Sequence, residues 1–151
     1  MCPTPASDNS SDMLRRTLLA LLASTSFFAA TFLVSPAVWS GSYLNRAALL
    51  LEQSRDERDM VLPRPNDKEL IVLVHGVAQA RARYGRKMNV PKVVAHAHPH
   101  LLLVLENSER AYAAALDGDH QRFLQHILRA RTEDKTFRAL IERTGYSLPP
   151  I

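Results

Sequence analysis

The chain has 151 residues, a formal net charge of +4 and one cysteine, Cys2. A single cysteine excludes an intramolecular disulfide and also the CxxCH pair that attaches a c-type haem. The basic excess permits contact with an acidic protein, an anionic lipid or a cell-wall polymer, and no nucleic-acid-binding motif accompanies it. We therefore expect one small domain held by packing or by a partner.

The first element is an uncharged apolar segment near the start of the chain. Between Arg16 and Arg46 the only ionisable side chain is Tyr43, and apolar residues dominate the 18 positions 17–34. That length is the shortest that spans a bilayer core of roughly 30 Å. The segment predicts entry into a membrane or passage across it, so we expect the protein in the cell envelope.

Two fates of this segment stay open. Arg15 and Arg16 before it, and Ser35-Pro36-Ala37 after it, are typical of a secretory signal peptide that is cut after Ala37. The alternative is an uncleaved anchor that contacts the membrane through residues 17–39, with Trp39 and Tyr43 at the membrane interface. Both fates leave the N-terminus cytoplasmic and export the rest, as a membrane-anchored domain or as a periplasmic or secreted one. Translation from Met13 would still give a complete signal.

The expected organisation of the chain follows from this leader and from one proline-rich break. We predict a polar extension (1–12), a signal peptide or signal anchor (13–41), a helix with a Pro-containing linker (42–66) and a helical domain (67–151).

The exported part begins with two predicted helices on either side of the linker. The first, 43–59, carries an apolar stripe that includes Ser54, and Pro63 and Pro65 end it. Asp67 can cap the second, 68–84, whose Leu70, Val74, Val77, Arg81 and Tyr84 fall near one face. The apolar start of this second segment is also good strand sequence.

A helical period then continues over 90–115, although Pro99 interrupts it. Either one helix kinks at Pro99, or a short helix ends and a second begins with this proline in its first turn. Asp117-Gly118-Asp119 predicts a stop, a turn and a new cap.

The last part of the chain is expected to hold two further helices. Phe123, Leu124, Ile127 and Leu128 would form the apolar stripe of the first, and Thr132 would cap the second, which Gly145 ends. The sum is an all-α protein, in which the N-terminal apolar signal or anchor helix precedes a small bundle or orthogonal array of four to five helices.

The strongest candidate for chemistry is the sequence AHAHPH, with His96, His98 and His100. Imidazole is a common ligand of transition metals and of haem iron. On a helix, His96 and His100 share a face, so His120 or His126 would have to complete a metal or haem site from a neighbouring helix. The alternative is a polar surface at a helix start.

A basic cluster is the second candidate. Its members, expected to contact an anionic partner, are Arg81, Arg83, Arg86, Lys87 and Lys92. The alternative is a set of solvated surface side chains.

The third candidate is IVLVHG, residues 71–76, where a His-Gly pair follows an apolar run. It resembles the strand and oxyanion-loop entry of the α/β-hydrolases. That family also requires a GxSxG nucleophile elbow, which this chain lacks. The resemblance implies a strand here; the alternative is an apolar helix with one glycine for close packing.

The sequence favours a non-enzymatic interaction module of the cell envelope. It would bind another protein, alone or within a membrane complex, as an assembly factor, accessory subunit, inhibitor or immunity-type protein. The alternatives are a metal- or haem-binding envelope protein and, more remotely, a hydrolase-like enzyme.

Overall fold

The structure, a computed structural model, describes the backbone of residues 36–149 and the side chains of residues 42–149. Within that range the chain is entirely helical, without strands, which confirms the all-α prediction there. The four α-helices and one short 3₁₀-helix are α2 (Pro36–Val61), α3 (Lys68–Arg86), η1 (Lys92–Val94), α4 (His98–Leu116) and α5 (His120–Arg143). The predicted apolar helix over 17–34 lies outside the described residues.

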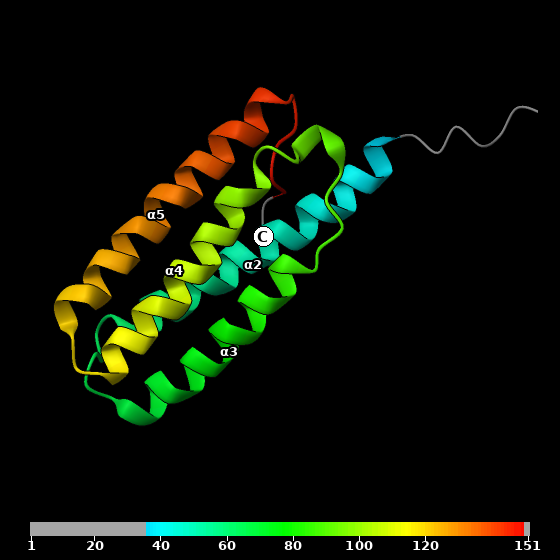
Figure 1. The fold of residues 1–151 in the computed structure, drawn as a ribbon. Coiled ribbons are helices and arrows are strands. Elements are labelled where there is room, and N and C mark those ends of the chain that lie inside the picture. Colours follow the sequence, from blue (N-terminus) through cyan, green and yellow to red (C-terminus); the bar gives the residue numbers. More distant parts are fainter. Residues whose placement is uncertain (1–35, 150–151) are drawn as a thin grey trace, which may run out of the picture. The chain divides into compact units, whose positions relative to one another are not determined.

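The four α-helices form an up-and-down bundle. Figure 1 shows that each helix runs antiparallel to the one before it. Helix α4 packs against all three others, most extensively against α5 and α3, and α2 also contacts α3. Short connections between antiparallel neighbours are typical of this architecture, and the bundle alternative of the sequence analysis is therefore the one observed.

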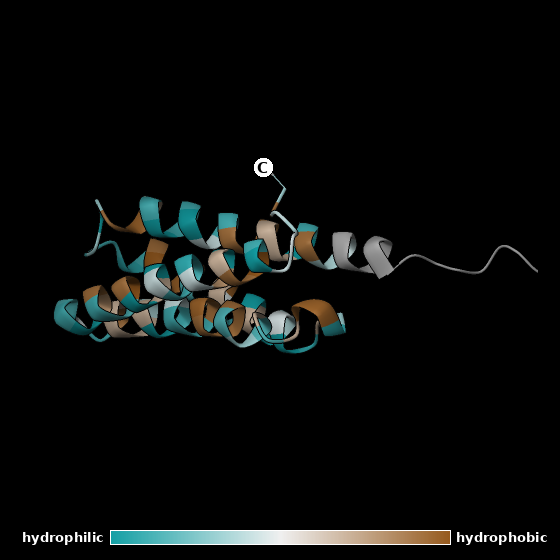
Figure 2. Cartoon of the chain, turned by 90° about the horizontal axis from the view of Figure 1, so that it is seen from above, coloured by the Kyte–Doolittle hydropathy of each residue, from teal (hydrophilic) through white to brown (hydrophobic). Residues whose placement is uncertain are grey.

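Two apolar clusters fill the interior, one towards each end of the helices. The first gathers large side chains such as Tyr43, Leu101 and Phe137, and the second gathers Ile71, Tyr112 and Phe123 among others. Apolar and hydrophilic residues are interspersed along each helix in Figure 2. This is the pattern of helices that bury one face and expose the other to water.

The helix boundaries follow local turn chemistry, as predicted. Asp67 and Asp119 accept hydrogen bonds from the third residue after each, Leu70 and Arg122, and so cap α3 and α5. Gly118 adopts a φ of 76° in the turn before α5. Glycine enters this left-handed region without the steric penalty that other residues incur.

Pro99 starts a helix and does not kink one. The structure has a short 3₁₀-helix at Lys92–Val94, and α4 then begins at His98 with Pro99 in its first turn. A proline there removes no helical hydrogen bond, because that backbone N–H has no partner within the helix anyway. Of the two alternatives, the second is the one observed.

The predicted break at Thr132 is wrong. α5 continues from His120 to Arg143, and the Thr132 hydroxyl donates a hydrogen bond to the Leu128 carbonyl oxygen at 3.1 Å. A threonine in mid-helix satisfies its hydroxyl in this way and then caps nothing. The apolar stripe assigned to 123–128 is also only half correct, since Leu124 and Leu128 are exposed.

α2 is longer than predicted and is an integral part of the bundle. It extends from Pro36 to Val61, and Tyr43, Leu44 and Leu51 lie in the first apolar cluster. The expected boundary between residues 41 and 42 therefore falls inside this helix. The helix of 42–66 and the domain of 67–151 also share one compact unit.

The buried face of α3 agrees only in part with the one that the sequence indicated, since Val74 and Arg81 are buried as expected and Leu70 is partly buried. The helix buries Ile71, Val74, Ala78, Ala82 and Gly85, with Arg81 beside them, while Val77 and Tyr84 face outward.

Close packing of α3 occurs at Gly85, where an added Cβ would lie 2.7 Å from Leu105 Cδ1. Gly76, which the sequence favoured for this role, has open space around it.

Candidate functional site

A layer of polar side chains lies where the two apolar clusters meet. Ser54 of α2 and Ser108 of α4 are both buried, and their hydroxyl oxygens are 2.7 Å apart. The Ser108 hydroxyl is also 2.9 Å from the Val104 carbonyl oxygen. Because each hydroxyl has one proton, the arrangement that satisfies both is a chain, with Ser54 donating to Ser108 and Ser108 donating to Val104.

This serine pair does not resemble an activated nucleophile. The Ser108 proton is directed at a backbone carbonyl, and among the described residues no histidine contacts either hydroxyl. Nucleophilic catalysis by serine requires a base within hydrogen-bonding reach.

An ion pair between Glu57 of α2 and Arg81 of α3 is the second part of the layer. The two side chains expose 13% and 3% of their surface. Burial raises the pKa of Glu57, and the Arg81 guanidinium acts in the opposite direction. Nε and Nη1 of Arg81, and the nearby hydroxyl of Tyr112, have no hydrogen-bond partner among the described residues. The pair is therefore incompletely satisfied.

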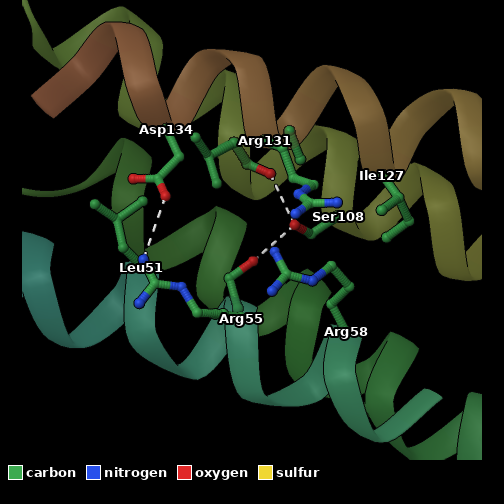
Figure 3. Close-up of a pocket in the computed structure, with 10 residues that line it drawn as sticks. Leu51, Arg55, Arg58, Ser108, Ile127, Arg131 and Asp134 are labelled. Atoms are coloured by element: carbon green, nitrogen blue, oxygen red, sulfur yellow. Dashed lines mark hydrogen bonds and ion pairs between the residues drawn. The ribbon is translucent and has the colours of Figure 1, made fainter. Parts of the chain in front are cut away.

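A small pocket opens beside the serine pair, between α2, α4 and α5 (Figure 3). Its cavity volume of about 20 Å³ is enough for one water molecule or one anion oxygen. Apolar side chains and the two serines form part of its lining, and the charged lining residues are Arg55, Arg58, Arg131 and Asp134. Three guanidinium groups against one carboxylate make this a positively charged pocket.

A second, more open hollow of about 400 Å³ lies along α4 and the start of α5. Its lining includes Arg110, Arg122 and His126 as well as two aspartates. The His126 ring nitrogen Nδ1 is 3.0 Å from Asn107 Oδ1, an atom that can only accept, so Nδ1 is the donor. Burial lowers the pKa of His126, and the positive charges of Arg129, Arg110 and Arg122 lower it further.

The lowered pKa of His126 predicts that acid destabilises the fold through this residue. The unfolded chain, with a histidine pKa of 6.5, binds the proton more readily than the native protein does, so native stability falls as the pH drops through about 6.5. We expect the free energy of unfolding, measured in urea by circular dichroism, to fall less steeply from about pH 7.5 to about pH 5 in His126→Gln than in the wild type.

His120→Gln is the matched control, because His120 is exposed on the same helix and has no side-chain hydrogen bond among the described residues. It should follow the wild type. A His126→Gln profile that is parallel to the wild type would contradict this assignment.

The histidines of the AHAHPH sequence are directed to different partners. His96 is exposed, His98 Nδ1 is 3.0 Å from the Tyr43 hydroxyl of α2, and His100 Nδ1 is 2.6 Å from Glu133 Oε2 of α5. Burial lowers the pKa of His98.

The other two histidines of the predicted metal site lie further along the bundle. His126 pairs with Asn107, seven positions after His100 and so roughly 10 Å along α4, and His120 begins α5. The described residues include no group of three or more His, Cys, Asp or Glu side chains that could hold a metal ion. Metal or haem binding stays a prediction of the sequence alone.

The predicted basic cluster is divided by the fold. Arg81 lies in the interior because it pairs with Glu57, so it is not available to an anionic partner. Arg86 pairs with Glu106 of α4 at 2.9 Å, and the exposed members Arg83, Lys87 and Lys92 complete the cluster.

The strand implied by the hydrolase resemblance is wrong. Residues 71–76 lie within α3, and His75 is 3.4 Å from Gln79 one turn later, as expected of neighbours on a helix. The sequence signal that resembled a buried strand is an apolar helix that is exposed on one side.

A row of exposed apolar side chains lies on this outer side of α3. Leu73, Val77, Ala80 and Tyr84 follow each other at intervals of four, three and four residues, and all are exposed. The exposed fractions of Leu73, Val77 and Tyr84 are between 46% and 67%. At 3.6 residues per turn, such intervals place the side chains on one stripe, opposite the buried face. We call these four residues the α3 stripe.

No protein-family model, no curated protein and no solved structure matches this chain. Within residues 36–149, no helix combines the length and the apolar character that crossing a membrane requires. The candidate surfaces therefore have to be judged by their own chemistry.

Two features of these surfaces were not recognised from the sequence. Ser54 and Ser108 each appeared in a helical stripe, but nothing indicated that they would pair. The sequence analysis assigned Val77 and Tyr84 to the same face as Arg81. The small residues of this helix carried the missing signal, because small side chains permit close contact between helices, and they lie on the packed face: Ala78, Ala82 and Gly85.

Proposed function

We propose that the helical domain binds another protein through the α3 stripe. The single observation that carries this proposal is the row of exposed apolar side chains on a helix whose opposite face is already buried in the bundle. Isolated exposed apolar residues are ordinary on protein surfaces, whereas an aligned row of them marks an interaction surface.

The spacing and the surroundings of the stripe indicate the kind of partner. Intervals of four, three and four residues match those by which one helix packs along another. Ala80 and the neighbouring Gly76 are small, and nothing lies within 4 Å of the position of a Cβ at Gly76, so a partner helix can approach closely. Basic residues along one edge, Arg83 and Lys87, favour acidic residues beside the apolar face of that helix.

Binding is tested by recovering complexes from solubilised membranes and from the soluble envelope fraction. We expect the wild type to recover a stoichiometric protein partner, and Val77→Glu to reduce its recovery at least about tenfold, because a carboxylate would be buried without a counter-charge. Arg83→Glu should reduce recovery by a smaller factor, because it reverses a charge at the edge of the stripe and not within it.

Leu128→Glu is the matched control, since it introduces the same charge at an apolar position of α5 that is also exposed, at 60% against 46% for Val77. It should leave the complex intact. Absence of any stoichiometric partner, or equal effects of Val77→Glu and Leu128→Glu, would refute the proposal.

We infer from the apolar leader that this binding takes place in the cell envelope. Intact mass of the protein from membrane and soluble envelope fractions tests the inference. A soluble species that begins at Val38 would establish a released domain, and a full-length membrane species would establish an anchored one. Cleavage after Ala37 would remove only the first two residues of α2 and keep Tyr43, where the first apolar cluster begins. Full-length protein confined to the cytoplasm would contradict the inference.

A further inference from the structure

Two arginines from different helices point into the pocket beside the serine pair. Figure 3 shows Arg58 of α2 and Arg131 of α5 reaching from opposite sides towards Ser108. Ser54 also lines the pocket. Like charges that converge in this way repel each other, and the repulsion is relieved when an anion lies between them. The two residues are 73 positions apart in the sequence, so the fold alone creates this arrangement.

The counter-ions near the pocket leave a positive charge uncompensated. Arg58 pairs with Asp59 at 2.8 Å, and Arg55 pairs with Glu52 at 3.2 Å and with Asp134 at 3.5 Å. Asp134 is shared with Arg138, which lies 2.8 Å from it. The described residues provide no ion pair for Arg131. An anionic ligand would therefore gain most by pairing with this guanidinium group.

The small volume of the pocket limits which part of a ligand can enter it. A cavity of about 20 Å³ admits a single oxygen atom, and Arg58 and Arg131 are among the residues that line it. Guanidinium groups bind phosphate oxygens through paired N–H donors. Ser54, which also lines the pocket, has a hydroxyl that can rotate to donate to an entering oxygen.

We propose that Arg58 and Arg131 bind a phosphate group, with one oxygen directed towards the serine pair. The site is separate from the α3 stripe and lies between α2, α4 and α5. The phosphate can be free or can belong to a lipid headgroup, since the chemistry of recognition is the same.

The proposal is tested on the full-length protein with inorganic phosphate as the probe. We expect calorimetric titration at constant ionic strength to show binding that becomes about tenfold weaker in Arg131→Gln and is lost in the Arg58→Gln/Arg131→Gln double variant. Arg129→Gln removes an exposed charge from the same helix but not from the pocket, and it should bind phosphate as the wild type does.

A thermal unfolding series gives a second readout in the same proteins. Phosphate stabilises many proteins non-specifically, because it is excluded from their surfaces. A specific site requires that phosphate raise the melting temperature of the wild type and of Arg129→Gln more than that of the double variant. Equal shifts in all three, or an absence of calorimetric binding to the wild type, would overturn the proposal.

The source of the phosphate is distinguished by one further arm. Vesicles of phosphatidic acid that displace inorganic phosphate from the wild type would assign a headgroup, and vesicles that leave phosphate bound would assign the free anion.

Discussion

Replacing Glu57 with alanine is expected to lower the free energy of unfolding by about 3–5 kcal/mol, because it leaves the Arg81 guanidinium buried without a counter-charge. Arg81 already has two nitrogen atoms without hydrogen-bond partners, so no alternative acceptor is in place to replace the carboxylate. Urea unfolding of the full-length protein, followed by circular dichroism, measures the change. Glu52→Ala is the matched control on the same helix. The side chains of Glu52 and its partner Arg55 are 32% and 39% exposed, so only about 0–1 kcal/mol should be lost.

The double variant Glu57→Leu/Arg81→Met distinguishes two causes of instability: an unpaired buried charge, and the loss of the specific side chains at these two positions. Apolar side chains of similar volume avoid the desolvation of both ions, so we expect most of the lost stability to return. A double variant as unstable as Glu57→Ala would show that the pair contributes through its specific geometry. It would also refute the unpaired charge as the cause of the instability of the single variant.

Replacing Phe137 with alanine is expected to cost about 3–5 kcal/mol of unfolding free energy, since the ring is fully buried in the first apolar cluster and its removal leaves a cavity. The same urea titration measures it. Leu128→Ala removes an apolar side chain of the same helix that is 60% exposed, and it should change stability by no more than about 0.5 kcal/mol.

The comparison of Phe137 with Leu128 also tests the face of α5 that packs in the bundle. If Leu128→Ala were as destabilising as Phe137→Ala, the stripe 123–128 predicted from the sequence would describe the buried face better than the structure does. A small effect of Phe137→Ala would likewise contradict the observed packing.

Helix boundaries were the part of the fold that the sequence predicted best. Asp67, Asp119 and Gly145 act within a turn of their own position, through a side-chain cap or a positive φ. Such effects depend on near neighbours in the sequence, so they can be read from it. For Pro99 the sequence left two alternatives open, and the structure shows that it starts a helix. The exceptions were the start of α2, which lies at Pro36, and the predicted cap at Thr132. The Thr132 hydroxyl can cap a helix or donate to a carbonyl one turn earlier, and in the continuous helix α5 it does the second.

The buried faces were predicted less well. α3 carries apolar residues around most of its circumference, so a period alone fits more than one face. Contacts with neighbouring helices select the face that is buried. Gly85 packs against Leu105 of α4, and Arg81 forms a buried ion pair with Glu57 of α2. The α3 stripe is the apolar remainder that this packing leaves exposed.

The candidate sites show the same difference between residues that are close in the sequence and residues that only the fold brings together. The sequence identified AHAHPH and the basic cluster because their members are consecutive or nearly so. The structure gives His98 and His100 separate partners on α2 and α5, and it removes Arg81 from the surface. The pocket of Arg58 and Arg131 combines three helices, and no local pattern predicts it.

By itself, the sequence determined that residues 36–149 are all-helical, and where most of the helices in that range start and end. These properties depend on backbone preferences and on residues a few positions apart. Only the tertiary structure decided which face of each helix is buried, which arginine is internal and which side chains meet in the pocket. The physical reason is that these outcomes depend on contacts between helices, such as Ser54 with Ser108 across 54 positions, whose geometry no single helix contains.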